Sequence, residues 1–356
     1  MFILGNKNSH VNIKNNNIVF GILLSAIIAT FYSFQIISNT GLYNDLEFYF
    51  NSYLTCESQS LEDCVLWLIG ISGKVEPGIA VVYSFIKIFN VKSEMAVIGA
   101  LFFLMNIAAI FYVVRFKRYS IDEIQPLLRF CFLLLICFLN YYYFSITTYF
   151  VRQVFGVFLF LLSTQIKSKI IKILLLLASV LFHYSSIILI IGYIGSMMAL
   201  RITKGKSKIL LFAMCVLVAL AGYALQSNFG FLAINSNIDP YMDSNNVSSA
   251  IHTIQQYAIA LVILVYLQIR LNKKDENRMI LNTTMLFLVL FSIINFLNVH
   301  AAYRVFIPVG LYCSLLPLTH YRYLKNSFLF ISIYTLLILI NFRLSYRYFM
   351  GEYVPS

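Results

Sequence analysis

Residues 78–89 read GIAVVYSFIKIF, and whether this apolar stretch crosses a membrane decides the fold. A helix that spans the hydrocarbon core of a bilayer needs about 20 apolar residues, so a stretch of about 12 is short for a span. If it did span, every later loop would lie on the opposite side. The charges of those later loops therefore decide between the two arrangements.

Lys and Arg gather in clusters between the later apolar runs, at residues 115–118, 167–172, 201–208, 270–278 and 322–325. The cytoplasmic loops of membrane proteins are enriched in Lys and Arg. All these clusters face the cytoplasm if residues 77–90 stay on the outer surface, and all lie outside if the stretch spans. The charge bias therefore predicts that residues 77–90 form a juxtamembrane helix on the outer surface.

The composition indicates that lipid surrounds most of the chain. Of the 356 residues, 60% are hydrophobic and 11% are charged, whereas a soluble globular domain carries about 25% charged residues. The net charge of +12 does not indicate nucleic acid, because the basic residues lie in loop clusters rather than on one amphipathic face. We therefore expect no nucleic-acid partner.

The apolar runs predict an all-α polytopic membrane protein, with about eleven transmembrane helices in a single transmembrane domain, residues 1–356. The candidate spans are residues 18–37, 95–114, 127–146, 153–166, 172–182, 186–200, 208–225, 257–271, 279–297, 304–319 and 327–341. The first is expected to be an uncleaved helix whose N-terminus lies in the cytoplasm. Residues 172–200 are expected to turn near His183. The main outer loops are then 38–92 and 226–256, and the C-terminus lies outside.

Two of the six cysteines, Cys56 and Cys64, lie in the first outer loop. Outside the cytoplasm they can form a disulfide or remain two free thiols, and both readings stay open. The other four lie inside apolar runs, as small core residues do. No Cys/His spacing or HExxH motif indicates a metal, and no Walker A motif indicates nucleotide-driven transport. We expect neither a metal nor another cofactor.

Arg152 and Arg304 lie at helix ends on the predicted outer side, against the charge bias. An arginine at the membrane edge is costly and is therefore a candidate for function, although a single one can also extend to lipid headgroups. The planar guanidinium binds two phosphate oxygens at once. We predict that Arg152 and Arg304, with the neighbouring Gln153 and Tyr303, hold the pyrophosphate of a lipid-linked substrate.

The first outer loop is acidic, and three of its carboxylates stand out. Asp45 and Glu47 follow the first helix, and Glu76 directly precedes Pro77. An acid beside a proline is also an ordinary helix start, and acids of outer loops are usually just solvated. Near a bound sugar, however, a carboxylate can act as the general base on an acceptor hydroxyl. These three residues are therefore candidate catalytic groups.

His183 is the fourth catalytic candidate. It lies in Phe182-His183-Tyr184-Ser185-Ser186, at the predicted turn between two short helices. A single histidine in an apolar segment is more often structural than catalytic. At a turn that opens outward, it can donate a hydrogen bond to phosphate or sugar and can titrate near neutral pH.

These motifs occur together in an order typical of a known family. They are Asp45 to Tyr49 with Tyr53, Glu76-Pro77-Gly78, Arg152-Gln153, Phe182-His183-Tyr184-Ser185 and Arg304. From about residue 43 to residue 308, the chain resembles the EpsG family of polysaccharide polymerases, within the broader Wzy type of O-antigen and capsule polymerases. Such proteins are similar to the GT-C class of membrane glycosyltransferases, which have an acidic first outer loop, juxtamembrane helices and short broken helices.

The resemblance implies a reaction at the outer face of the bacterial inner membrane. There, oligosaccharide repeat units carried on undecaprenyl pyrophosphate are joined into O-antigen, capsular or exopolysaccharide. Arg152 and Arg304 would stabilise charge on the pyrophosphate, and His183 would assist at the phosphate or the acceptor. Asp45, Glu47 or Glu76 would be the base or anchor the sugar. The expected partners are the lipid-linked oligosaccharide, membrane lipid and a chain-length regulator protein.

Three other functions compete with this one. The first is a GT-C-type transferase that adds one sugar from a polyprenyl phosphate. The second is an O-antigen ligase, which tends to have a larger late outer loop than the roughly 30 residues of 226–256. The third is not an enzyme: a flippase for lipid-linked oligosaccharides should have cationic residues inside its spans, and these spans lack them.

Overall fold

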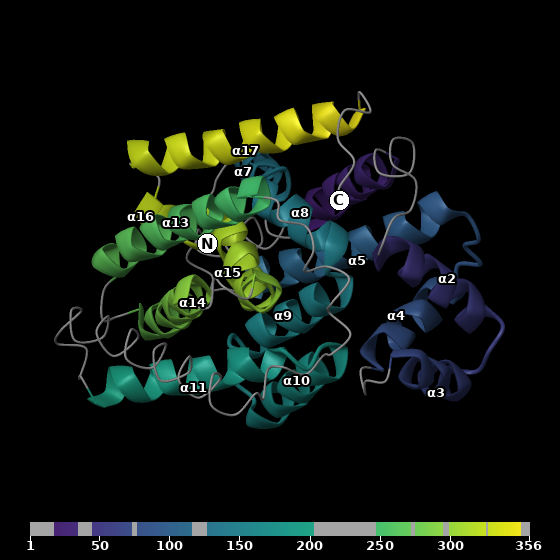
Figure 1. Cartoon of the computed structure of the whole chain (residues 1–356). Coiled ribbons are helices and arrows are strands. Elements are labelled where there is room, and N and C mark those ends of the chain that lie inside the picture. Colours follow the sequence, from purple (N-terminus) through teal and green to yellow (C-terminus); the bar gives the residue numbers. More distant parts are fainter. Residues whose placement is uncertain are drawn as a thin grey trace, which may run out of the picture. The chain divides into compact units, whose positions relative to one another are not determined.

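The computed structural model describes residues 18–34, 45–72, 77–115, 127–202, 247–271, 275–294, 299–324 and 327–349, and within these residues it contains helices and no strand (Figure 1). The chain divides into two compact units. Unit 1 combines the residues up to Ser186 with those from Ser314 onward, and unit 2 runs from Ile187 to Cys313. The prediction of an all-helical protein is confirmed for the described residues.

Three of the described helices are long and apolar enough to cross a membrane. They are Glu94–Val114 within α5 (Glu94–Arg115), α14 (Glu276–Ile294) and Ala302–Thr319 within α15 (Val299–Thr319). Several other expected spans are shorter apolar helices, namely Ile18–Phe34, Val151–Ser163, Ser186–Ile202, Gln255–Arg270 and Phe328–Arg343. The expected span 208–225 lies outside the described residues. The count of about eleven spans therefore stays a prediction.

The segment 38–92, expected to be an outer loop with one helix, contains three helices in its described part: α2 (Asp45–Glu57), α3 (Leu61–Ser72) and α4 (Gly78–Lys87). The start of α3 is capped by a reciprocal pair of contacts. The Asp63 N–H donates to Ser60 Oγ at 3.1 Å, and the Ser60 hydroxyl donates to the Asp63 carboxylate at 2.6 Å. This Ser-x-x-acid pattern is a recognised helix start, and it explains why this part of the loop is helical.

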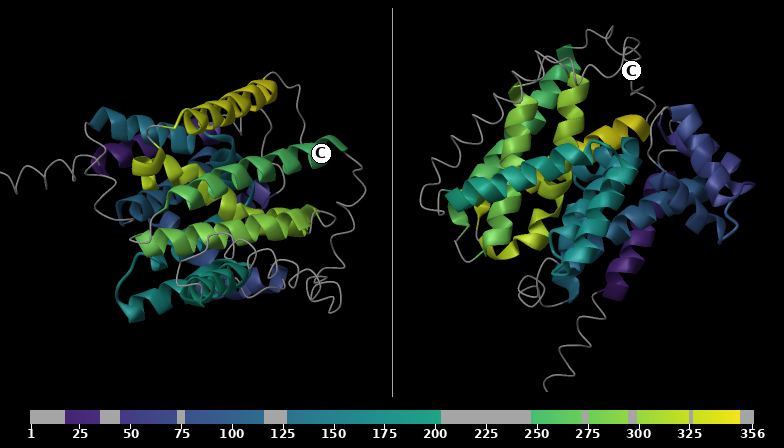
Figure 2. Two further views of the ribbon diagram at one scale, coloured as in Figure 1. Left: turned by 90° about the vertical axis from the view of Figure 1, so that its left-hand side faces the viewer. Right: turned by 90° about the horizontal axis from the view of Figure 1, so that it is seen from below.

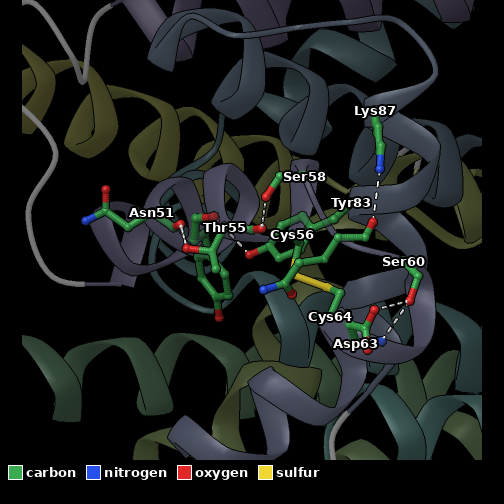
Figure 3. Close-up of a disulfide and its surroundings, with 11 residues drawn as sticks. Asn51, Thr55, Cys56, Ser58, Ser60, Asp63, Cys64, Tyr83 and Lys87 are labelled. Atoms are coloured by element: carbon green, nitrogen blue, oxygen red, sulfur yellow. Dashed lines mark hydrogen bonds between the residues drawn. A yellow bond between two sulfur atoms is a disulfide. The ribbon is translucent and has the colours of Figure 1, made fainter.

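A disulfide joins Cys56, at the end of α2, to Cys64, in the first turn of α3 (Figure 3). The sequence left open whether these cysteines form a disulfide or remain free thiols, and in the structure they form the disulfide. On α4, the Lys87 ammonium donates to the Gln59 carbonyl oxygen at 3.0 Å (Figure 3). The disulfide and this hydrogen bond therefore hold the three helices together as one group.

The short helix expected at 77–90 is α4, which is 10 residues long. Its Gly78, Ile79, Ala80, Val82, Tyr83 and Ile86 are buried. Val81 and Phe85 on α4 are exposed, and so are Ile88 and Phe89 in the turn that follows the helix. The prediction of a separate short helix is right, and its position on the outer membrane surface stays a prediction.

The expected span 127–146 is broken into α7 (Leu127–Phe138) and α8 (Tyr141–Tyr149). The two halves are bent by 55°. Asn140 occupies the break: its side-chain oxygen accepts from the Tyr143 N–H at 3.2 Å, and its amide donates to the Cys137 carbonyl at 2.7 Å. Asn140 therefore satisfies a backbone group on each side of the bend.

Two side chains from distant helices satisfy the remaining carbonyls of the break. The Tyr32 hydroxyl, from the helix Ile18–Phe34, donates to the Phe138 carbonyl at 2.8 Å. The Asn341 amide, from α17 (Phe328–Phe349), donates to the Leu139 carbonyl at 2.6 Å. A helix can be interrupted inside an apolar environment only where its freed backbone groups find such partners.

The predicted turn near His183 is confirmed. Here α10 (Lys169–Phe182) ends and α11 (Ser186–Ile202) begins. In unit 1, α10 lies side by side with α9 (Val151–Ser163), as two further views show (Figure 2). The Ser179 hydroxyl of α10 donates to the Gly156 carbonyl of α9 at 2.7 Å. This buried bond fixes the register of the two helices.

Unit 2 is built around α13 (Val247–Arg270) and α14, which are joined by buried polar groups. The Asn282 amide donates to the Gln268 side-chain oxygen at 2.6 Å and to the Leu264 carbonyl at 3.0 Å. The helix α13 begins at Val247, so residues 247–256, expected in a loop, are helical.

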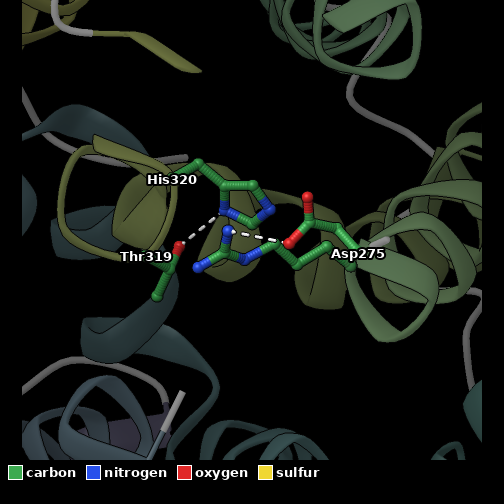
Figure 4. Close-up of polar contacts among 4 residues, drawn as sticks. Asp275, Thr319 and His320 are labelled. Atoms are coloured by element: carbon green, nitrogen blue, oxygen red, sulfur yellow. Dashed lines mark hydrogen bonds and ion pairs between the residues drawn. The ribbon is translucent and has the colours of Figure 1, made fainter. Parts of the chain in front are cut away.

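Figure 4 shows the polar contacts at the start of α14 and at the end of α15. In unit 2, Arg278 forms an ion pair with Asp275 at 3.4 Å. In unit 1, the Thr319 hydroxyl oxygen and His320 Nδ1 are 2.9 Å apart. Both contacts link neighbours in the sequence, so each stabilises a local helix end.

Candidate functional site

Arg152 is the second residue of α9, directly after the break at Phe150 that separates α8 from α9. Phe150 provides no side-chain cap for the new helix. Tyr49 of α2 provides an acceptor instead: its hydroxyl oxygen accepts from the Arg152 backbone N–H at 3.5 Å and from the Arg152 Nε–H at 3.4 Å. The half-buried Arg152 therefore links the start of α9 to α2.

Two aromatic rings of α2 flank the guanidinium. Its Cζ lies 5.9 Å from the centre of the Phe48 ring and 6.0 Å from the centre of the Tyr49 ring. At these distances the ring quadrupoles attract a cation. The rings meet edge to face, with their centres 5.9 Å apart. The aromatic pair therefore favours a charged arginine at this position.

Tyr83 of α4 joins the same cluster. Its hydroxyl donates to the Tyr49 backbone carbonyl at 2.9 Å. Burial raises the pKa of Tyr83 well above its ordinary value, and the nearby Tyr49 adds to the rise, whereas Arg152 opposes it. Tyr83 therefore remains a neutral donor at physiological pH. Three elements, α2, α4 and α9, thus meet around Tyr49.

His183 is buried at the end of α10, and its surroundings define its proton position. Its Nδ1 accepts the Ser185 backbone N–H at 3.2 Å and lies 2.7 Å from the Ser185 hydroxyl. Because a backbone N–H can only donate, Nδ1 is the acceptor and Nε2 carries the proton of the neutral ring. The ring also stacks on Tyr184, with centres 5.0 Å apart.

Two glycines allow close packing around the His183 turn. A Cβ on Gly78 would lie 2.6 Å from the ring of Phe182, and a Cβ on Gly156 would lie 2.8 Å from the Ser186 hydroxyl. Gly156 is one turn after Arg152 on α9, so the arginine and the histidine turn are carried by the same pair of helices. The motifs that are separate in the sequence at Gly78, Arg152 and His183 therefore lie in one region of unit 1.

The other predicted site residues of unit 1 are placed in part. Glu47 is exposed on α2, and Gln153 is buried on α9. Asp45 begins α2, but its side chain lies outside the described part of the structure, as does the whole of Glu76. Which carboxylate acts as the base therefore stays a prediction.

Tyr303 and Arg304 belong to α15 and to unit 2, and both are half-buried. Tyr303 packs against Phe306, with ring centres 6.3 Å apart. The predicted shared role of Arg304 and Arg152 at one pyrophosphate stays a prediction. Among the described side chains, no group of three or more His, Cys, Asp or Glu residues is arranged to hold a metal ion.

Sequence reasoning assigned no role to Tyr83 or Gly156, and it included Tyr49 only as part of a motif. The partner of Tyr49 is 103 positions away, so no local pattern signals the contact. The sequence contained only a weak indication that Gly156 belongs to the site: it lies four residues after Arg152 and therefore on the same helix face.

The family model described as the EpsG family matches residues 18–355. No curated protein and no solved structure matches the chain.

Proposed function

The chain belongs to the EpsG family, and on this premise we propose that it is a membrane-bound polymerase of polysaccharide biosynthesis. The observation that carries the proposal is the family match, because it extends over residues 18–355 of a 356-residue chain. The apolar helices of both units support a location in a membrane.

The proposed substrates are oligosaccharide repeat units linked to undecaprenyl pyrophosphate. The surroundings of Arg152 support an anionic group at this point. A guanidinium can form two parallel hydrogen bonds to phosphate oxygens, and the first turn of a helix favours negative charge. Arg152 combines both features at the start of α9. Gln153, Tyr303 and Arg304 complete the proposed pyrophosphate-binding set.

In the proposed reaction, an acceptor sugar hydroxyl attacks the anomeric carbon of the donor. A new glycosidic bond forms, and the bond from that carbon to the pyrophosphate oxygen breaks. Undecaprenyl pyrophosphate leaves with the bonding electron pair, and Arg152 and Arg304 stabilise the charge that develops on it. The hydroxyl proton passes to a carboxylate, for which Asp45, Glu47 and Glu76 are the candidates.

His183 serves in this reaction as a hydrogen-bond donor. Its Nδ1 is occupied by the Ser185 N–H, so the proton of the neutral ring is on Nε2. This tautomer supports donation to a phosphate or sugar oxygen. Accepting a proton at Nδ1 would break the bond to the Ser185 backbone, so the arrangement favours donation from Nε2.

We place the reaction at the outer face of the bacterial inner membrane. Two observations support this side for α2 to α4. Disulfides persist in oxidising compartments such as the periplasm, and Cys56 is bonded to Cys64. The exposed apolar residues Val81 and Phe85 of α4, followed by the exposed Ile88 and Phe89 in the next turn, suit a segment that lies at a membrane surface.

Deletion of the gene tests the function directly. A strain that lacks a polymerase should still make one repeat unit on its lipid carrier or lipid core, and should lose every longer chain. Gel electrophoresis of the extracted glycolipids would then show a single short band in place of a ladder. Complete absence of repeat units would instead indicate a flippase or a ligase. Re-expression of the intact chain should restore the ladder in either case.

A further inference from the structure

We infer that Tyr49 is a positioning residue for Arg152, and that Tyr83 holds Tyr49 in place. The inference rests on the proposed role of Arg152 at the pyrophosphate. It assigns to the Tyr49 hydroxyl a function in the reaction, although this hydroxyl acts only through the arginine.

The first argument is that the Tyr49 hydroxyl contacts Arg152 both at its backbone and within its side chain. The Tyr49 oxygen accepts the backbone N–H at 3.5 Å and the Nε–H at 3.4 Å. Two contacts from one residue to one atom close a ring, which restricts the torsions between the backbone and the guanidinium. Both distances are long for N–H···O bonds, so each bond contributes little binding energy. The restriction of the side chain comes from the two contacts acting together.

The second argument concerns which nitrogen is used. The contact to Tyr49 involves Nε. A phosphate is bound bidentately by parallel N–H groups along one edge of the guanidinium, and the two terminal amino groups form such an edge. A hydrogen bond at Nε therefore sets the rotation of the plane that presents this edge. The Phe48 and Tyr49 rings, each about 6 Å from Cζ, restrict the same plane.

The third argument is that Tyr49 is itself fixed. Its side chain is 3% exposed, and its backbone carbonyl accepts the hydroxyl of Tyr83, which is 1% exposed. Tyr83 lies on α4, whose first residue packs against Phe182 next to His183. The orientation of Arg152 is therefore coupled through two tyrosines to the helix that carries the Pro77-Gly78 motif.

A purely structural role for Tyr49 is the competing explanation. Phe150 offers no side-chain acceptor to the start of α9, so the Tyr49 oxygen serves as a substitute cap for the Arg152 N–H. Loss of a cap lowers the stability of a protein, but it leaves the turnover of the molecules that remain folded unchanged. Activity per folded molecule therefore separates the two explanations.

The test compares Tyr49→Phe with Tyr53→Phe in the purified full chain, assayed with a lipid-linked repeat unit. Tyr53 is the matched control: it is buried one turn further along α2, and its hydroxyl donates to the Val91 carbonyl at 2.7 Å. We expect Tyr49→Phe to lower kcat on the order of tenfold with KM changed less than about twofold. Tyr53→Phe should leave both constants unchanged. An unchanged kcat for Tyr49→Phe would overturn the inference.

A double-mutant cycle shows whether Tyr49 acts through Arg152. Arg152→Lys keeps the positive charge but removes Nε and the planar fork. In that background, Tyr49→Phe should cause no further loss of kcat; an equal loss in both backgrounds would overturn the inference. If Arg152→Ala keeps normal chain lengths, the proposed role of Arg152 fails and the inference fails with it. If Arg152→Ala removes long chains and Tyr49→Phe does not lower kcat, only the inference fails.

Discussion

Gly78 lies in direct contact with Phe182: a Cβ built on Gly78 would be 2.6 Å from two ring carbons of Phe182 and 2.8 Å from its Cα. The first residue of α4 therefore packs on the last residue of α10, directly before His183. Because one of the close atoms is backbone, side-chain movement alone cannot make room for a larger residue. The contact thus fixes the distance between α4 and the histidine turn.

Gly78→Ala should destabilise the protein and lower its activity. The added methyl group overpacks a buried contact, which typically costs about 1–3 kcal/mol. The unfolding temperature of the purified protein in detergent measures this loss. Gly70→Ala is the control, since Gly70 is an exposed residue within α3 and a Cβ there would meet nothing within 4 Å. Equal unfolding temperatures for the two variants would show that the close contact at Gly78 does not determine the stability of the protein.

Arg152→Ala and Arg304→Ala should each abolish long polysaccharide chains while the protein still inserts into the membrane. Each change removes a charge that is proposed to stabilise the leaving pyrophosphate, and loss of such a group commonly costs about 10²–10³-fold in rate. The glycolipid ladder gives the result, and an epitope tag gives the amount of membrane protein. Arg201→Ala, at an exposed position in the last turn of α11, should leave the ladder intact. Normal ladders in both test variants would rule out the pyrophosphate role.

The disulfide should be detectable by thiol labelling in intact cells. Cys56 and Cys64 should react with a membrane-impermeant maleimide only after reduction. Cys56→Ser should leave Cys64 reactive without reduction, because Cys64 then has no bonding partner. Loss of a cross-link that closes so short a loop should destabilise the folded chain by about 2–3 kcal/mol. Labelling of the unreduced native chain at these positions would show that the bond does not form in the cell.

The topology can be measured with reporter fusions at residues 117 and 240, both of which lie outside the described part of the structure. Residue 117 belongs to a basic cluster and should report the cytoplasm, whereas residue 240 should report the exterior. The reverse pattern would mean that residues 77–90 cross the membrane.

Asn341→Leu should destabilise the broken span. The substitution keeps the branched shape of the side chain but leaves the Leu139 carbonyl without its donor, which costs about 1–3 kcal/mol for a buried group. The neighbouring Phe342→Leu, at an exposed position on α17, serves as the control. Similar unfolding temperatures for both variants would show that the bend does not depend on Asn341.

The sequence predicts those features that depend on local composition. The length of the apolar run at 78–89 and the charges of later loops were sufficient to predict α4 as a short helix, and the polar residues at 183–186 predicted the division between α10 and α11. The helix α3 was missed although Ser60 and Asp63 carry a local signal for its start. That signal lies in an acidic segment whose carboxylates suggested only a solvated loop.

Features that depend on distant partners could not be predicted in this way. The break at Asn140 is stabilised by Tyr32 and Asn341, which are 106 and 202 positions away from the carbonyls that they contact. At the candidate site, the charge bias identified Arg152, but its contact with Tyr49 depends on the fold bringing one residue of α2 to the start of α9. Composition shows which residues are unusual, and it does not show which of them meet.

The bond from Asn341 to the Leu139 carbonyl has a consequence for biogenesis. During synthesis, residue 139 leaves the ribosome some 200 residues before its partner. Until α17 has been translated, the interrupted helix carries a carbonyl whose native donor has not yet been made. The middle of the chain can therefore reach its final form only after the C-terminal helix is inserted, and a truncated chain that lacks α17 should be a target for membrane quality control.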